Sequence, residues 1–459
     1  MRTPAVILLL TIALAASSAA PRIACVAAGD AGSVRLTFPG PDAYPSLLAQ
    51  ALGSEIRLFA SRAVAGGPPP ASFRELEKFS PDAVIIEPLA GDSITPGDSL
   101  RARESLTSFV AACHRLGSSP RVILLLPPPL PGVAETTGTV LRDRVLPLIR
   151  AVAWATGCEV VDTYSMFLDH RDLFDGAGIA SSAAGKIVAG RLAGLLRLQA
   201  MPGADIIARA GIRGGLSNYF GYECTTFTFA GREARIVRPK RTAAGSPWIW
   251  RARFWGHEPQ TEVALLERGF HVVYCDVAEL FGNDEALAAW DSFYVMLTRA
   301  GLSPRAALEG FSRGGVYVYR WAVHAPEAVA CVYADAPVLD FKSWPGGKGK
   351  GGGNTEEWDR FKRDFRLASE AEGLAFRGNP LDMAEAIARG GYPMLHVCGL
   401  ADVVVPFEEN TEPFERNILR CGGRITVITK PGIGHHPHSL PNPAPIVDFI
   451  LRATGQPVD

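Results

Sequence analysis

Gly310-Phe311-Ser312-Arg313-Gly314-Gly315 is the stretch that decides how the second half of this 459-residue chain folds. A strand-like apolar run, 305–309, precedes it, and a helix-like run, 316–323, follows it. Between a strand and a helix, G-x-S-x-G makes so tight a turn that only small residues fit two positions either side of the serine. The pattern therefore predicts that the Ser312 hydroxyl stands clear of a sheet edge, where a nucleophile is needed.

Two later segments present the other groups that a serine nucleophile requires. An apolar strand-like run, 393–398, ends shortly before Asp402. A second run, 424–429, is followed by a glycine-lined loop that ends at His435. We expect His435 to act as the general base, and Asp402 to hold the imidazole in its reactive tautomer.

Two of these assignments have an alternative within the chain. Asp335 follows another strand-like run and is the alternative acid, although Asp402 has the better loop context. His436 is the alternative base, and we prefer His435 because it directly follows the flexible glycine loop. We expect His435, His436 and His438 to form no metal site, because no carboxylate or cysteine lies near enough in the sequence to complete one.

The order Ser312, Asp402, His435 is the chain order of the α/β-hydrolases, which the chain resembles from 205 to 455. The resemblance implies an eight-stranded catalytic domain in which strands five, seven and eight carry nucleophile, acid and base. A hairpin is expected over 225–240 because apolar and polar residues alternate around Gly231. The later strands are expected, in order, at 248–254, 271–277, 306–311, 329–334, 393–398 and 424–429.

The same resemblance implies an oxyanion hole built from two backbone N–H groups. Arg313, which follows the nucleophile, would supply one of them. We assign the other to Arg251 in the loop after the third strand, although no His-Gly-Gly motif is present there. The guanidinium of Arg251 or Arg253 would also suit a substrate carboxylate or sugar hydroxyls. Surface or interdomain ion pairs are the alternative role for these two arginines.

A glycine-rich segment, 344–354, stands at the position of a lid in this fold. We expect it to be mobile and to close over substrate with Trp344 or Trp358. Lys348 in this segment would favour an anionic ligand. A phosphate-binding P-loop is excluded because no Gly-Lys-Ser/Thr leads into a helix. A disordered surface insertion is the alternative interpretation.

The first half of the chain alternates apolar, strand-like runs with helix-like stretches, which predicts a doubly wound parallel sheet. The expected strands are 22–27, 55–60, 82–89, 121–127 and 159–163. Segments 44–53, 81–86 and 183–185 resemble the SGNH, or GDSL, hydrolases: the helix after the nucleophile loop, the strand before the Gly-x-Asn-Asp block, and the start of the last helix. The resemblance implies a flavodoxin-type α/β/α sandwich over 21–200.

The catalytic positions of the SGNH family are replaced in this half. Ala27-Ala28-Gly29-Asp30-Ala31 stands in place of Gly-Asp-Ser, and Ala60 or Ala63 in place of the oxyanion-hole glycine. Leu89-Ala90-Gly91-Asp92 lacks the asparagine of the third block, and 177–181 lacks both acid and base. A hydroxyl without a base is a poor nucleophile, so we expect this domain to be catalytically inactive. It would pack against the second domain or hold a polymeric substrate.

Composition and the N-terminus indicate a compartment. Residues 1–20 have the pattern of a signal peptide, with Arg2, an apolar run over 6–16 and the small residues Ser18-Ala19-Ala20. We therefore expect a secreted or periplasmic protein with no membrane span after signal removal. A net charge of -1 gives no pull toward nucleic acid. Eight cysteines without a C-x-x-C pair argue against a structural zinc site or a redox dithiol.

Together these patterns predict a cofactor-independent serine esterase of carbohydrates, whose partner is an ester-substituted glycan or another ester. The peptidases of the prolyl oligopeptidase group share the G-x-S-x-G turn and the order of the triad, and they are the alternative enzyme class. We rank them lower because we find no propeller domain of the kind that gates their site. The alternative of another class is a non-catalytic glycan-binding protein, although three retained catalytic residues speak against it.

Overall fold

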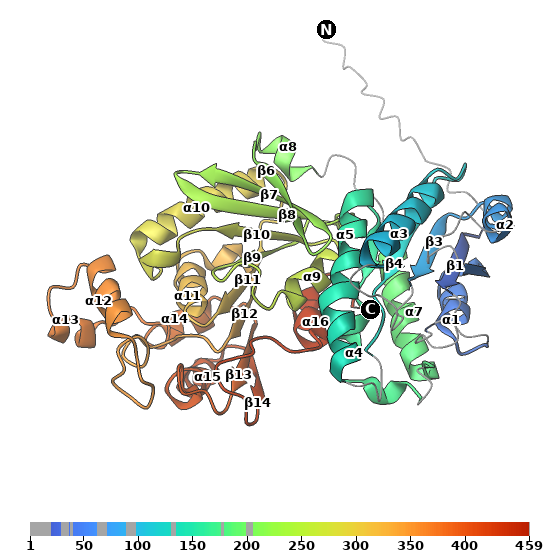
Figure 1. Cartoon of the computed structure of the whole chain (residues 1–459). Coiled ribbons are helices and arrows are strands. Elements are labelled where there is room, and N and C mark those ends of the chain that lie inside the picture. The colour runs from blue at the N-terminus through green and yellow to red at the C-terminus, as the bar shows by residue number, and fades with distance from the viewer. Residues whose placement is uncertain are drawn as a thin grey trace, which may run out of the picture.

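The computed structural model describes residues 20–28, 36, 40–61, 71–88, 98–129, 135–175, 179–198 and 205–458. A five-stranded sheet organises the first half of the chain and a nine-stranded sheet the second. Figure 1 shows the two sheets beside each other, each covered by helices. No helix in these ranges is long and apolar enough to span a bilayer.

The first sheet is parallel throughout and has the strand order β2-β1-β3-β4-β5. This confirms the parallel sheet that the alternation of strands and helices predicted, and the order is that of flavodoxin-like folds. Its strands are β1 Arg22–Ala28, β2 Glu55–Ser61, β3 Ala83–Glu87, β4 Arg121–Leu125 and β5 Glu159–Val161.

Helices cover both faces of this sheet because alternate strand residues are apolar on each side. Ile23 and Cys25 pack toward α1 Tyr44–Leu52 and α7 Ser182–Arg197. Ala24 and Val26 pack in the opposite layer. That layer contains α2 Ala71–Phe79, α3 Asp98–His114 and α5 Leu146–Thr156, and the shorter helices of this half are α4 Glu135–Val140 and α6 Thr163–Met166.

Most of the replaced SGNH positions lie outside the described residues. This applies to 29–31, 62–70, 89–97 and 176–178, and to residues 1–19 of the expected signal peptide. The inactivity of the first half and its SGNH-like character therefore stay predictions.

The second sheet is mixed, with the order β14-β13-β12-β11-β9-β10-β8-β7-β6. It has nine strands rather than the expected eight, because β6 pairs antiparallel with β7 ahead of the hairpin. Four of the five residues of β6 are exposed, so it lacks the apolar alternation by which strands are found. The strands are β6 Gly215–Tyr219, β7 Tyr222–Phe229, β8 Arg232–Arg238, β9 Trp248–Arg251, β10 His271–Cys275, β11 Ala306–Phe311, β12 Val329–Asp335, β13 Met394–Gly399 and β14 Ile425–Lys430.

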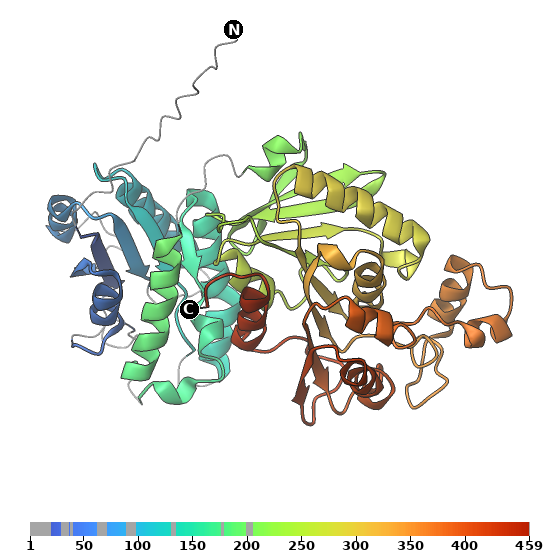
Figure 2. The same ribbon diagram turned by 180° about the vertical axis from the view of Figure 1, so that it is seen from behind.

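Helices also cover both faces of the second sheet. On one face lie α9 Gln260–Leu266 and α16 Ala444–Ala453, which Figures 1 and 2 show between this sheet and the first half of the chain. The other face is covered by α10 Asp284–Arg299, α11 Gly314–His324, α14 Ala384–Arg389 and α15 Thr411–Arg420. The remaining helices of this half are α8 Ile206–Arg209, α12 Thr355–Asp364 and α13 Glu370–Ala375.

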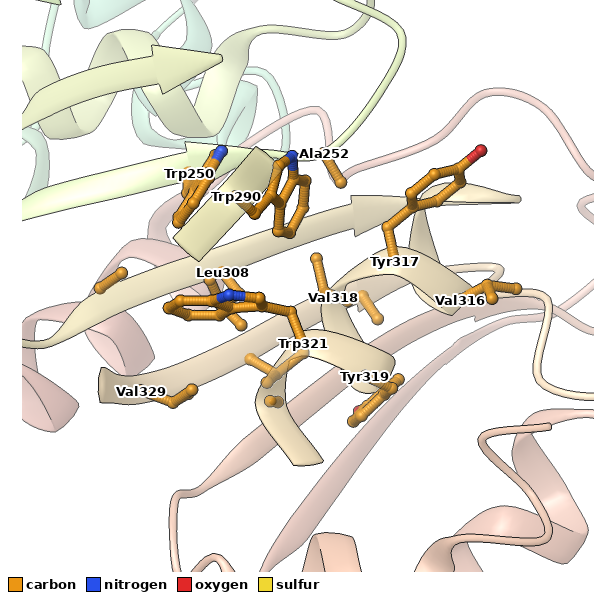
Figure 3. Close-up of a cluster of buried hydrophobic side chains, with 14 of the residues drawn as sticks. Trp250, Ala252, Trp290, Leu308, Val316, Tyr317, Val318, Tyr319, Trp321 and Val329 are labelled. Atoms are coloured by element: carbon orange, nitrogen blue, oxygen red, sulfur yellow. The ribbon is translucent and has the colours of Figure 1, made fainter. Parts of the chain in front are cut away.

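An aromatic cluster fills the layer between this sheet and helices α10 and α11 (Figure 3). The ring centroid of Trp250 on β9 lies 4.4 Å from that of Trp290 on α10 and 5.1 Å from that of Trp321 on α11. All three side chains are buried. Large buried aromatic rings contribute strongly to packing, so α11 is held firmly against the strands. The turn that precedes α11 therefore rests on a rigid foundation.

Buried ionic contacts join the two halves of the chain. Glu267, directly after α9, accepts a hydrogen bond from the Asp162 backbone N–H at 2.9 Å. Its other carboxylate oxygen lies 3.4 Å from Nε of Arg191 on α7. Burial raises the pKa of Glu267 to about 7, because desolvation disfavours the charged carboxylate more than Arg191 stabilises it.

This pKa predicts how stability depends on pH. Between pH 4.5 and about 7 the folded chain keeps the Glu267 proton that the unfolded chain has lost. The contribution of Glu267 to the free energy of unfolding therefore falls as pH rises through this range, and it is constant above it. The rise from 4.5 to about 7 corresponds to about 3 kcal/mol. Denaturation of wild type and Glu267→Gln at several pH values should show that wild type loses this amount of unfolding free energy relative to the variant between pH 4.5 and about 7. If the free energies of unfolding of the two proteins change with pH in parallel, Glu267 does not have a raised pKa.

Candidate active site

Three side chains from the carboxyl ends of three strands meet in one hydrogen-bonded chain. Ser312 follows β11, Asp402 lies in the loop after β13, and His435 lies in the loop after β14. Ser312 Oγ is 2.9 Å from His435 Nε2, and His435 Nδ1 is 2.7 Å from Asp402 Oδ2. With Nδ1 donating to the carboxylate, Nε2 is free to accept the serine proton. Counted from β7, these strands are the fifth, seventh and eighth.

The turn at Ser312 keeps the hydroxyl above the sheet by an unusual backbone conformation. Ser312 has φ +49°, in the left-handed region that non-glycine residues rarely adopt. Three backbone hydrogen bonds hold it there. Ser312 N–H donates to the Asp335 carbonyl at 2.8 Å, and the Ser312 carbonyl accepts from Val338 N–H at 2.9 Å and Gly315 N–H at 3.0 Å. Such a conformation costs on the order of 1–3 kcal/mol and persists only where surrounding contacts enforce it.

The two glycines that flank Ser312 differ in how closely they are packed. A Cβ on Gly310 would lie 2.7 Å from the Gly314 carbonyl oxygen and 2.9 Å from Val318 Cγ2. A Cβ on Gly314 would meet nothing nearer than Ala252 Cβ at 3.6 Å, an ordinary contact.

We therefore expect Gly310→Ala to lower the free energy of unfolding by about 1–3 kcal/mol, as overpacking does. Gly314→Ala should leave it unchanged or raise it by up to about 1 kcal/mol, because alanine favours a helix. Urea denaturation of both variants measures the difference. Equal effects of the two substitutions would show that the turn is not packed as described.

Asp402 is held by the loop that carries it. Its Oδ1 accepts hydrogen bonds from the backbone N–H groups of Val404 at 2.8 Å and Val405 at 2.9 Å. Its side chain is 1% exposed. These contacts fix the orientation of the carboxylate and leave Oδ2 for His435.

The alternative acid, Asp335, has other partners. Its Oδ1 lies 2.8 Å from His438 Nδ1, and its Oδ2 accepts hydrogen bonds from Ser439 N–H at 2.8 Å and the Tyr333 hydroxyl at 3.1 Å. The structure thus contains a second, buried His–Asp pair beside the first one. Asp335 also supports the Ser312 backbone through its carbonyl, which is a positioning contact. His435, and not His436, lies between Ser312 and an acid.

Two backbone N–H groups near Ser312 are free to bind an oxyanion. Within the described ranges, the N–H groups of Arg313 and Arg253 have no backbone hydrogen-bond acceptor. The two residues lie close together, because a Cβ on Gly314 would be 4.0 Å from Arg253 N. Ala252 N–H, by contrast, donates to Glu309 O on β11 at 2.9 Å. Alternation along a parallel strand then directs the Arg251 N–H toward β10, so the geometry favours Arg253 over Arg251 as the second donor.

The Arg251 guanidinium does not face substrate either. It is fully buried, and it pairs with Glu262 at 2.8 Å and with Glu309 at 3.5 Å. It also donates to the backbone carbonyls of Arg253 at 2.7 Å, Phe254 at 2.9 Å and His257 at 2.7 Å. Arg251 therefore holds the loop after β9 in place. A guanidinium has five N–H donors. In Arg251, protein atoms accept the hydrogen bonds that the sequence analysis expected a ligand to accept.

The other residues proposed to bind substrate also have internal partners. Arg253 donates to the Ala278 carbonyl at 2.6 Å and pairs with Glu279 at 3.2 Å. Lys348 pairs with Glu370 at 2.8 Å. The expectation that these cations receive an anionic ligand is thus not supported by their contacts.

Trp344 lies next to the residue that follows the nucleophile. The guanidinium carbon of Arg313 is 5.5 Å from the centroid of the Trp344 ring, and Arg313 also pairs with Glu357. This places the start of the glycine-rich segment beside the Ser312 turn.

The segment 344–354, which the sequence predicted to be a mobile lid, makes internal backbone contacts. Backbone N–H groups of Gly346, Lys348 and Asn354 donate at 2.8–2.9 Å to carbonyls at Phe341, Lys342 and Pro345. Its glycines allow backbone segments to approach where a Cβ would clash, as at the Gly347 and Gly353 pair. Trp358, the other residue expected to close over substrate, is buried in α12.

No protein-family model and no curated protein sequence matches this chain. Solved structures align with about half of it. A candidate dipeptidyl aminopeptidase IV from Bacteroides ovatus is 15% identical with a TM-score of 0.39, covering 52% of this chain and 36% of its own. Porphyromonas gingivalis dipeptidyl peptidase 4 is 17% identical with a TM-score of 0.36, covering 47% and 32%. Pyrococcus horikoshii acylaminoacyl peptidase is 14% identical with a TM-score of 0.37, covering 47% and 38%. The chain thus spans well under half of each of them, and these low scores transfer no activity to it.

Proposed function

We propose that the chain is a serine hydrolase that cleaves carboxylic esters through Ser312, His435 and Asp402. The observation that carries the proposal is the hydrogen-bonded chain of these three side chains, with distances of 2.9 Å and 2.7 Å. A serine with a neighbouring base, and a base oriented by a buried acid, is the arrangement that activates a hydroxyl for attack on a carbonyl.

The geometry supports a two-step acyl transfer. Ser312 Oγ attacks the carbonyl carbon while its proton passes to His435 Nε2, and Asp402 stabilises the imidazolium that forms. The oxyanion accepts hydrogen bonds from the N–H groups of Arg313 and Arg253. When the tetrahedral intermediate collapses, the proton on His435 passes to the leaving alcohol. Water then repeats the sequence and releases the acid.

The class of substrate is a finer proposal, which rests on sequence patterns. Ester-substituted carbohydrate is our first candidate, because the chain resembles esterases in its second half and SGNH hydrolases in its first. The anionic ligand that the basic residues suggested is withdrawn, since Arg251, Arg253 and Lys348 are paired within the protein. A peptide is the second candidate, because the same three side chains also cleave amides. The apolar N-terminal run supports a secreted or periplasmic enzyme.

A fluorophosphonate probe tests the proposal directly, because it labels only an activated serine. We expect wild type to be labelled and Ser312→Ala not to be. A matched control is Ser343→Ala, which removes a hydroxyl that donates to Glu409 at 2.6 Å outside the triad and should leave labelling intact. Labelling that persists in Ser312→Ala, or no labelling of wild type, would refute the proposal that Ser312 is the nucleophile of a serine hydrolase.

A substrate panel then separates the two enzyme classes. Acetylated and methyl-esterified oligosaccharides are compared with peptide amides, using product release as the readout. Turnover of esters but not amides supports the esterase, and preferential turnover of amides overturns it in favour of a peptidase.

A further inference from the structure

Three histidines from two loops come together beside the Ser312 site. His257 lies in the loop after β9, and His436 and His438 lie in the loop after β14. One ring nitrogen of each lies within 4.8 Å of the other two. Their ring centroids are 4.7–5.9 Å apart. Among the described residues, no other cluster of three potential metal-ligating side chains is as close.

The environment of His438 is that of an anchored metal ligand. Its Nδ1 lies 2.8 Å from Asp335 Oδ1, and both side chains are almost fully buried. Donation from Nδ1 to a carboxylate leaves the Nε2 lone pair free, and a carboxylate is one of the acceptors that commonly orient a histidine bound to a metal. The mechanism proposed above does not use Asp335 or His438 at the reacting atoms.

The other two histidines are exposed and can adjust to an ion. His436 and His257 both lie at the surface. The loop of His257 is itself held in place, because Arg251 donates to the His257 carbonyl at 2.7 Å. One anchored imidazole and two exposed ones make a site that can close by rotation of the exposed side chains.

We propose that His257, His436 and His438 bind a borderline divalent transition-metal cation, of which Zn²⁺ is the type. A tetrahedral zinc with Zn–N bonds of about 2.0–2.1 Å holds its ligand nitrogens roughly 3.3–3.4 Å apart, which needs a shift of about 1 Å in the exposed rings. Three neutral imidazoles suit Zn²⁺, Ni²⁺ or Cu²⁺, whereas Mg²⁺ and Ca²⁺ require oxygen ligands. The fourth position remains open to water or an external ligand.

A bound cation would also act on the neighbouring base. The His435 ring centroid lies 5.0 Å from that of His436 and 4.9 Å from that of His438. A divalent charge there opposes the imidazolium that forms when His435 takes the Ser312 proton, so the metal inhibits turnover reversibly. This consequence rests on the proposed function, whereas metal binding itself does not.

Calorimetric titration of the tag-free, full chain with Zn²⁺ tests the site without any substrate. We expect one saturable site per chain, and no binding of Mg²⁺. His257→Ala and His436→Ala should each weaken Zn²⁺ binding by about 100-fold or more, since loss of an outer-shell partner alone costs about 10–100-fold. The matched control is His324→Ala, which removes an exposed histidine at the C-terminal end of α11 that pairs with Asp291 on α10. This variant should bind Zn²⁺ as wild type does.

Two results would overturn the metal site: no saturable Zn²⁺ binding by wild type, or equal affinity in His257→Ala. Co²⁺ gives a second readout, because a tetrahedral three-nitrogen site produces intense visible absorption that the His257 variant should lack. If Zn²⁺ binds through His257 but the protein cleaves no substrate and accepts no probe, the metal site stands and the hydrolase fails. If the protein cleaves substrate but Zn²⁺ neither binds to it nor inhibits it, the hydrolase stands and the metal site fails.

Discussion

Asp402→Asn should lower kcat by about four orders of magnitude, as loss of the correct histidine tautomer does where serine, histidine and aspartate act as a triad. The reason lies in the contacts of Oδ1, which accepts hydrogen bonds from Val404 N–H and Val405 N–H. In the variant the amide oxygen must stay at that position, so the amide NH₂ faces His435 Nδ1. The ring proton is then forced onto Nε2, which can no longer accept the proton of Ser312.

Asp335→Asn is the matched control, because Asp335 is the other buried aspartate paired with a histidine. We expect its kcat, measured on the folded fraction, to change by less than about tenfold, although stability falls because a buried network loses its charge. Steady-state hydrolysis of a p-nitrophenyl ester and thermal denaturation of each variant measure the two effects. A larger loss of kcat in Asp335→Asn than in Asp402→Asn would make Asp335 the acid of the triad.

The sequence was sufficient to bring the three triad residues together because each stands at a strand end with a local signal. Gly310 and Gly314 mark the turn around Ser312, and apolar runs end just before Asp402 and His435. Carboxyl ends of neighbouring parallel strands meet at one edge of a sheet, so chain order alone places their loops together. The same reasoning failed for β6, whose exposed residues carry no apolar period.

The partners of the basic residues were not predictable in this way, because they depend on packing between distant segments. Arg251 was assigned to the oxyanion hole from its place after the third strand, while its partners come from α9 and β11. One signal was present: Glu309 is a charged residue inside the buried strand β11, and such a residue needs a partner. His257 gave no local signal at all, because the histidines it joins lie in a loop far along the chain.

The cluster of Arg251, Glu262 and Glu309 carries one positive charge against two carboxyl groups, all fully buried. Burial raises the pKa of Glu262, and it raises that of Glu309 well above its usual range, with the neighbouring Glu262 carboxylate as the second cause. We therefore expect Glu309 to be protonated and Glu262 to balance the guanidinium. The charges in the cluster then sum to zero, which is the condition for its burial.

Arg251→Met should accordingly lower the free energy of unfolding by about 3–5 kcal/mol, the cost of breaking a buried ion pair from one side. The substitution leaves Glu262 without a counter-charge and removes the donors to three carbonyls of the loop after β9. Because that loop carries Arg253 N–H, kcat should fall as well. Chemical denaturation and ester hydrolysis of the same preparation measure both effects.

Arg251→Lys separates the two causes, because lysine keeps the charge but loses the planar fork of donors. If charge balance dominates, the lysine variant keeps most of the stability. If the loop contacts dominate, it is nearly as unstable as Arg251→Met and loses similar activity. The further variant Arg251→Met/Glu262→Gln removes the orphaned charge, so it should regain part of the stability but not the activity. A loss below about 1 kcal/mol in Arg251→Met would mean that water reaches the cluster and that the loop after β9 is held by other contacts.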